Sequence, residues 1–268
     1  MSRIEQTLKT LKEQGRKGLV PFVTAGYPTI GQTVPVLHAL VEGGADIIEF
    51  GMPFSDPMAD GPIIQHSSEV ALKNGMTLKK VLAQVAEFRK GNTTTPIVLM
   101  GYANPIENMG QQAFVDAASE AGADGVLVVD YPPEESEEFA AMLKAKGMDQ
   151  IFLLAPTSVD ERIHHVAKIG GGFIYYVSLK GVTGAGNIDV TEVRQRINRI
   201  KAIVPFPVAV GFGVRDAETA RRLGQAADAV VMGTRLIQEM DKVQPEKAPE
   251  AVAAFLKPVR KALDESAV

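Results

Sequence analysis

The chain of 268 residues contains no cysteine. This absence excludes disulfides, thiolate nucleophiles and cysteine-based zinc sites, and it is compatible with a reducing compartment. Long apolar runs are missing as well, because none approaches the roughly 18 residues of a transmembrane helix. The first residues also lack the apolar core of a signal peptide. We therefore expect a cytoplasmic protein that does not associate with membranes.

Runs of one charge sign are absent too. The 28 basic and 32 acidic residues are interspersed and give a net charge of -4, so no basic tract could follow a phosphate backbone. Nucleic acid is therefore not an expected partner. The four histidines, at positions 38, 66, 164 and 165, do not have the spacing of metal ligands. We interpret them as surface or packing residues and expect no metal site.

Apolar residues are abundant, at 46% of the chain, which is enough for one large core. We expect a single domain over residues 1–268. Short β-forming runs alternate with segments of helical periodicity, and eight runs are found at residues 19–24, 47–50, 97–100, 125–129, 151–154, 173–177, 208–210 and 229–232. Alternating strands and helices predict parallel pairing, and eight such units predict an α/β fold of the (β/α)8 TIM barrel type.

The two ends of the chain add helices to this barrel. The apolar spacing of Ile4, Leu8 and Leu11 predicts an extra N-terminal helix before the first strand. A last helical pattern follows the eighth strand and contains Pro258, which predicts a kink or a shortened helix.

A short motif ends a helix and opens a strand three times, at residues 44–47, 122–125 and 226–229. Each copy contains Ala-Asp, and the first two begin with glycine. We expect a mechanical role, with the glycines accommodating a left-handed helix end.

Glu49 ends an otherwise apolar strand. Burying a carboxyl group is costly unless the group is paired or used, so Glu49 is either ion-paired within the core or catalytic. A second carboxylate, Asp60, follows in the next connection, where alone it would mark an Asp-Gly turn. Reactive groups of a barrel lie where strands run out into loops. The two carboxylates together therefore favour a catalytic site.

Two connections after strands are predicted to be long. The second strand is separated from the helical pattern near Leu78 by 27 residues, 51–77, whereas such loops usually have about 2 to 6. The sixth connection, residues 178–187, contains three glycines and polar side chains, which is typical of a loop that folds over a ligand or of a flexible linker.

Glycines follow the seventh and eighth strands, in Gly211-Phe212-Gly213 and Gly233-Thr234. They allow backbone N–H groups at a helix start to approach an anion, and these two loops form the usual phosphate site of a barrel. The alternative is two tight turns without a ligand. Residues at other strand ends could line a pocket for a flat apolar group, although each alone is more often a core residue: Phe22, Met100, Tyr102, Leu127, Tyr175 and Phe212.

Four segments together closely resemble the tryptophan synthase alpha subunit family, and the match spans nearly the whole chain: residues 21–26, 49–62, 181–184 and 211–214. The resemblance implies a lyase of tryptophan biosynthesis that cleaves indole-3-glycerol phosphate to indole and glyceraldehyde 3-phosphate. It also implies that this chain carries no metal or organic cofactor. The partner would be a beta subunit bearing pyridoxal phosphate, in an alpha-beta-beta-alpha complex.

The resemblance also assigns individual residues. The family's catalytic carboxylates fall on Glu49 and Asp60, and its active-site tyrosine falls on Tyr175. The closing-loop threonine corresponds to Thr183, and the phosphate-binding backbone corresponds to Gly184, Gly213, Gly233 and Thr234. Two departures are visible. Leu179-Lys180 stand where some members carry arginine and a small polar residue, and Met100 stands where some have leucine, a volume-conserving change.

The residue types suit this reaction. Retro-aldol cleavage requires a proton on indole C3, removal of the hydroxyl proton and stabilisation of the ring N–H. Glu49 would give the proton to C3 and take the proton of the hydroxyl group. Asp60 would hydrogen-bond the ring N–H and stabilise its positive charge. Three alternatives remain open: a Schiff-base aldolase using Lys180, a metal-dependent or other phosphosugar aldolase or isomerase, and a catalytically silent scaffold that binds a partner.

Overall fold

The computed structural model describes residues 1–177, 190–211 and 213–265. Its strands are all parallel and lie in the order β5-β4-β3-β2-β1-β9-β8-β7-β6. Their bounds are β1 (Gly18–Thr24), β2 (Ile48–Gly51), β3 (Ile97–Gly101), β4 (Gly125–Val128), β5 (Asp149–Gln150), β6 (Phe152–Leu154), β7 (Ile174–Val177), β8 (Val208–Gly211) and β9 (Ala229–Met232).

The sheet closes on itself through β5 and β6. These two strands are separated only by Ile151, β5 pairs with β4, and β6 pairs with β7. Ile151 itself continues the ladder, because its N–H donates to the carbonyl of Val126 at 2.9 Å. The two pieces therefore act as one strand, and the predicted eight-stranded barrel is confirmed.

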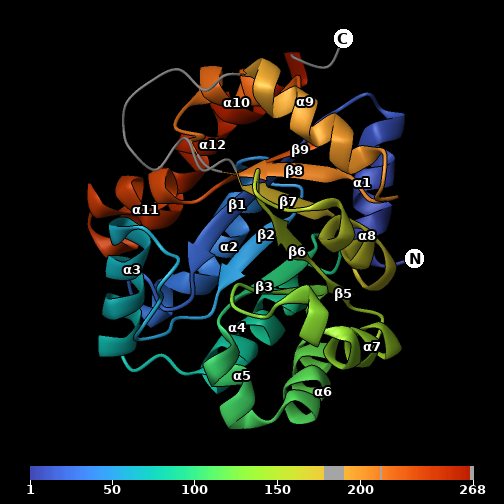
Figure 1. Ribbon diagram of the computed structural model, residues 1–268. Helices are drawn as coiled ribbons and strands as arrows, with labels where there is room; N and C mark the ends of the chain where they lie inside the picture. Colours follow the sequence, from blue (N-terminus) through green and yellow to red (C-terminus); the bar gives the residue numbers. More distant parts are fainter. Residues whose placement is uncertain (178–189, 212, 266–268) are drawn as a thin grey trace.

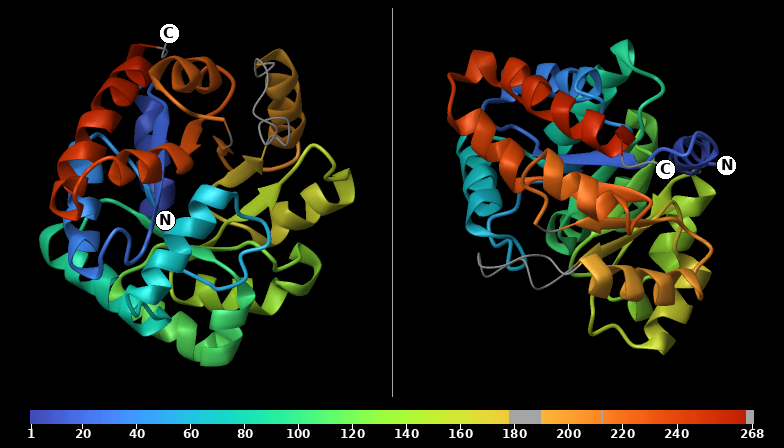
Figure 2. Two further views of the ribbon diagram at one scale, coloured as in Figure 1. Left: turned by 90° about the vertical axis from the view of Figure 1, so that its left-hand side faces the viewer. Right: turned by 90° about the horizontal axis from the view of Figure 1, so that it is seen from above.

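Helices surround the strands (Figures 1 and 2). They are α1 (Arg3–Glu13), α2 (Thr33–Glu42), α3 (Pro62–Lys73), α4 (Leu78–Gly91), α5 (Ala103–Met109), α6 (Gln111–Ala121), α7 (Glu137–Ala145), α8 (Asp160–Ile169), α9 (Val190–Lys201), α10 (Ala217–Gly224), α11 (Thr234–Asp241) and α12 (Ala248–Glu265). Single 3-10 turns lie at η1 (Ile30–Gln32), η2 (Pro133–Glu135) and η4 (Pro245–Lys247). No helix of the described residues is long and apolar enough to cross a membrane.

The predicted N-terminal helix, α1, closes the end of the barrel where the strands begin. Ser2 caps it, since the Ser2 hydroxyl accepts the N–H of Glu5 and the Glu5 carboxylate accepts the N–H of Ser2. Its buried residues Ile4, Leu8 and Leu11 pack on the side chains inside the barrel. Figure 1 shows α1 on the opposite side of the barrel from α3 and α11, which lie at the carboxyl ends of the strands.

Two predictions about the connections need correction. The second connection contains a helix, α3, so its irregular part ends at Gly61. Helix α12 runs without a break through Pro258, which is exposed, and is therefore not shortened. A proline on a solvent-facing side of a helix leaves the unpaired carbonyl one turn earlier open to water. The sixth connection falls in residues 178–189, outside the described residues.

The repeated motif joins neighbouring strands through its aspartates Asp46, Asp124 and Asp228. Each aspartate donates its backbone N–H, at 2.9 Å, to a residue of the preceding strand, and its carboxylate accepts that same residue's N–H at 2.8 Å. The three partners are Leu19, Ile97 and Val208. We call these contacts the aspartate joints. The two glycines of the motif have positive φ, 100° at Gly44 and 92° at Gly122, as expected for left-handed helix ends.

A basic side chain neutralises each aspartate joint. Arg260 donates to Asp46 at 2.8 Å, and Lys201 donates to Asp228 at 2.7 Å. Asp124 is 4% exposed and pairs with Arg89 at 2.6 Å and also with Arg3. Removing one partner of such a buried pair leaves the other charge without compensation.

We expect Asp124→Ala to lower the free energy of unfolding by about 3 to 5 kcal/mol, because it removes the counter-charge of the largely buried Arg89 guanidinium and the acceptor of the Ile97 N–H. Urea unfolding measures the effect. The control is Asp116→Ala, which removes an exposed ion pair with Lys146 and should leave the midpoint unchanged. Equal effects of the two substitutions would contradict a special role of the joint.

Candidate active site

Glu49 lies in β2, two residues after Ile47, which belongs to the inner core, the cluster of side chains inside the barrel. Because side chains of a strand alternate between its two faces, Glu49 also faces the interior of the barrel. It has no exposed surface, and neither carboxylate oxygen has a hydrogen-bond partner among the described residues. Burial alone raises the pKa of Glu49 to about 8. Glu49 has no ion-pair partner among the described residues, so the interpretation of Glu49 as an ion-paired core residue is wrong for this part of the chain.

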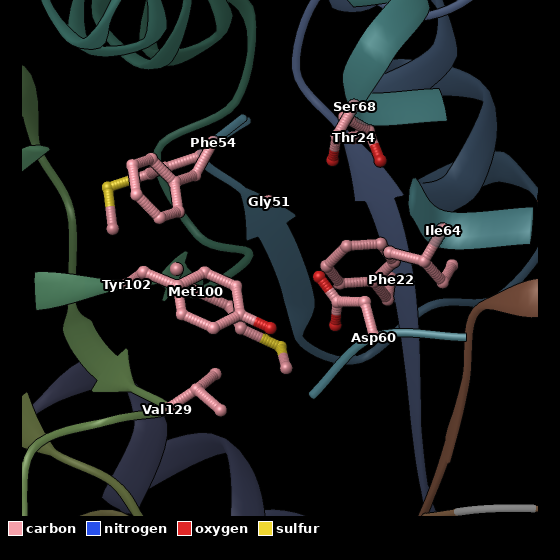
Figure 3. A pocket seen from close by; sticks show the side chains of 12 residues that line it. Phe22, Thr24, Gly51, Phe54, Asp60, Ile64, Ser68, Met100, Tyr102 and Val129 are labelled. Atoms are coloured by element: carbon pink, nitrogen blue, oxygen red, sulfur yellow. The ribbon is translucent and has the colours of Figure 1, made fainter. Parts of the chain in front are cut away.

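Asp60 approaches the same region from the connection between β2 and α3. Burial raises the pKa of Asp60 to about 6, and a hydrogen bond from the Tyr102 hydroxyl acts in the opposite direction. Figure 3 shows the Tyr102 hydroxyl pointing toward the Asp60 carboxylate beside the ring of Phe22. The site thus contains two carboxyl groups with different pKa values, one on a strand and one on a loop.

Tyr175 completes this group from β7, across the barrel. Burial raises the pKa of Tyr175 well above its usual value, and the charges of Glu49 and Asp60 raise it further. These electrostatic effects show that the three predicted catalytic residues lie near one another. Gly211 on the neighbouring strand β8 makes room for Tyr175, because a Cβ at Gly211 would overlap the tyrosine hydroxyl.

A hollow of about 300 Å³, partly open to solvent, lies at the carboxyl ends of β1, β2 and β3 (Figure 3). Of the predicted residues it is lined by Phe22, Asp60, Met100 and Tyr102. Other lining residues were not predicted individually from the sequence: Thr24, Gly51, Met52, Phe54, Ile64, Ser68, Gly101 and Val129. Ile64 and Ser68 belong to α3, so recognising that helix would have identified them. Leu127 is buried in the inner core and does not line the hollow.

The predicted phosphate loops are described in part. Gly213 follows β8 and has a φ of 83°, a conformation that favours glycine. Gly233 is the N-cap of α11 and Thr234 is its first residue, with no side chain capping the helix start. Backbone N–H groups at such a helix start suit an anion. Three further predicted residues, Thr183, Gly184 and Phe212, lie outside the described residues.

Metal chemistry finds no support in the described part of the chain, where no group of three or more histidine, aspartate or glutamate residues could hold a metal ion. None of the described lysines is buried either. A Schiff-base lysine is activated by desolvation. Partial burial lowers the pKa of Lys17, but Lys17 lies before β1 and donates to the carbonyl of Ala227, at the end of the barrel where the strands begin and away from the hollow. Lys180 lies outside the described residues.

Comparisons with known proteins agree with this geometry. A family model described as tryptophan synthase alpha chain matches residues 8–265. The tryptophan synthase alpha chain of Azoarcus sp. (strain BH72) is 64% identical over 264 residues, covering 98% of this chain and 97% of that protein. The one from Paraburkholderia phytofirmans is 59% identical over 267 residues, covering 100% and 99%. The crystal structure of tryptophan synthase subunit alpha from Legionella pneumophila str. Paris has a TM-score of 0.93 at 40% identity and covers 99% of both chains. The chain belongs to the tryptophan synthase alpha chain family.

Proposed function

We propose that Glu49 and Asp60 are the two catalytic carboxyl groups of the reaction that this family catalyses. Tryptophan synthase alpha chains are lyases that cleave indole-3-glycerol phosphate in tryptophan biosynthesis. They have no cofactor of their own and work in a complex with a beta subunit, which carries the pyridoxal phosphate. The observation that carries the residue assignment is the buried Glu49 carboxyl, which has no partner among the described residues.

Glu49 acts as the proton donor to indole C3. With a pKa of about 8 it is protonated at neutral pH, the form that an acid requires. Once it has given up the proton, it is a carboxylate in apolar surroundings and therefore a strong base. It then takes the proton of the glycerol hydroxyl while the bond from C3 to that carbon breaks. The products are indole and the aldehyde, and Glu49 ends the cycle protonated.

Asp60 acts on the other side of the ring. With a pKa of about 6 it is ionised at neutral pH, so it accepts a hydrogen bond from the indole N–H and stabilises the positive charge that develops when C3 is protonated. The different environments of the two carboxyl groups separate their pKa values, so Glu49 is protonated and Asp60 is ionised at neutral pH. Tyr175 lies beside both and orients the reacting groups.

The remaining predicted residues bind the two ends of the substrate. Phe22, Tyr102 and Phe212 form the apolar surroundings of the indole ring, whereas Leu127, also predicted to bind the substrate, belongs to the core inside the barrel. Backbone groups of Gly184, Gly213, Gly233 and Thr234 bind the phosphate, and Thr183 is the substrate-binding threonine of the sixth connection. The helix start of α11 and the positive φ of Gly213 support the described part of this phosphate site.

The family membership and the site together favour a cytoplasmic protein that folds as one barrel domain over residues 1–268. Cell fractionation tests the location. Limited proteolysis tests the domain, and early cleavage into two stable fragments would contradict it.

The purified chain should release indole from indole-3-glycerol phosphate, and Glu49→Gln should lower kcat by about 10² to 10⁴, because an amide cannot transfer protons. Asp60→Asn should be similarly impaired through lost charge stabilisation. Indole release measured with and without a beta subunit tests both variants. Turnover of Glu49→Gln within a few-fold of the unchanged chain would disprove the acid assignment.

Burial of Glu49 should also make stability depend on pH. The folded-state pKa of about 8 exceeds the ordinary value of 4.5, so folded protein binds more protons than unfolded protein between these pH values. The stabilising effect is complete below pH 4.5 and is lost as pH rises to 8. Glu49→Gln should match the unchanged chain near pH 4.5 and exceed it by a few kcal/mol above pH 8. Urea unfolding at both pH values would show this, and a difference independent of pH would exclude it.

Gly213→Val should raise KM for indole-3-glycerol phosphate more than it lowers kcat, because a side chain there obstructs backbone contact with the phosphate. The matched control is Gly110→Val, which has a similar φ of 88° and open space around its Cβ. Both variants place valine at a positive φ, and only the first should alter KM. Glycerol phosphate should compete with the substrate in the unchanged chain.

A further inference from the structure

The side chain of Tyr102, which directly follows β3, contacts the loop that carries Asp60. Its hydroxyl accepts the backbone N–H of Ala59 at 3.1 Å and points toward the Asp60 carboxylate (Figure 3). Its ring packs against Phe54 of the same loop, with the ring centres 5.7 Å apart. Three contacts to one loop therefore come from a single side chain on a neighbouring element (Figure 3).

The position of Tyr102 is itself well fixed. The residue is 3% exposed and lies between β3 and α5, where it is the N-cap of that helix. The next residue, Ala103, donates its N–H to Asp130 after β4 at 2.7 Å. Strand β3 pairs with β2, which carries Glu49. Tyr102 therefore has a constant position relative to the strand-borne acid.

The loop holds the backbone of Asp60 but not its carboxylate. The Asp60 N–H donates to the carbonyl of Pro57 at 3.0 Å, and the Gln65 side chain donates to the carbonyl of Asp60 at 2.8 Å. Among the described residues, the carboxylate faces one donor, the Tyr102 hydroxyl (Figure 3). Its orientation therefore depends on one phenolic hydroxyl.

We propose that Tyr102 is a positioning residue for Asp60, holding one carboxylate oxygen so that the other can accept the indole N–H. This inference rests on the proposed role of Asp60. A carboxylate can accept several hydrogen bonds, so the contact with Tyr102 and the contact with substrate are compatible. The bond from Ala59 fixes the hydroxyl lone pair and directs its proton toward Asp60.

Tyr102 also favours the ionised form of Asp60. Tyr102 and Tyr175 are the titratable groups that interact with this carboxylate. Glu49 acts on Tyr175, and Asp130 acts on Tyr102 from beyond β4. Burial and the nearby Asp60 raise the pKa of Tyr102 above its usual value, so the phenol stays a proton donor. Loss of the donated hydrogen bond removes the one effect that lowers the pKa of Asp60.

Tyr102→Phe removes the hydroxyl and keeps the ring against Phe54. We expect kcat to fall about 10- to 100-fold at pH 6.5, the usual effect of losing one charge-assisted hydrogen bond, with a smaller change in KM. The acid limb of the pH profile of kcat should move to higher pH, whereas the alkaline limb, set by Glu49, should stay. Turnover relative to the unchanged chain should therefore recover between pH 6.5 and 7.5.

Tyr176→Phe is the matched control, since Tyr176 is 2% exposed and packs in the outer core away from the site. It should leave the pH profile unchanged. Asp60→Asn separates the two levels of inference, because it should be impaired at every pH. An active Asp60→Asn would overturn the role of Asp60. The positioning role alone would be overturned if Asp60→Asn is impaired but Tyr102→Phe leaves the acid limb of the pH profile unmoved. This conclusion holds whether or not Tyr102→Phe lowers kcat.

Discussion

The burial of one carboxyl group without a counterion is the constraint on which the catalytic end of this barrel depends. Glu49 is fully buried and lacks a hydrogen-bond partner among the described residues. Desolvation therefore disfavours its charge, and the carboxyl stays protonated until about pH 8. A basic neighbour would stabilise the fold and remove the acid at the same time. The site thus retains a group that the fold alone would not favour.

At the opposite end of the barrel, the buried carboxylates have basic partners. Asp46, Asp124 and Asp228 each bind a strand N–H and a basic side chain, so their charges are compensated. Helix α1 covers the apolar side chains at this end. Acidic residues therefore stabilise one end of the barrel and are proposed to react at the other. The difference lies in the partners that each carboxyl group has.

The sequence predicts the barrel well because each strand and most helices have a local apolar pattern, and Glu49 is conspicuous because it interrupts such a pattern. Helix α3 is missed because its buried residues are the small Ser67, Ser68 and Ala71, so the segment that Pro62 opens lacks a stripe of large apolar side chains. The roles of Gly211 and the Tyr102 hydroxyl are missed for another reason. They depend on contacts with Tyr175 and Asp60, which are distant in the chain, and no local pattern encodes such contacts.

The two carboxyl groups also differ in what can move them. Glu49 is part of a strand paired on both sides, so its position follows the barrel as a whole. Asp60 lies on a loop whose neighbouring residue Met58 is 85% exposed, and its carboxylate is oriented through Tyr102. A protein that contacts this loop can change the orientation of Asp60 while the acid stays in place. On the proposed mechanism, turnover then responds to the fraction of molecules in which the Asp60 carboxylate faces the ring N–H, without any change in the barrel itself.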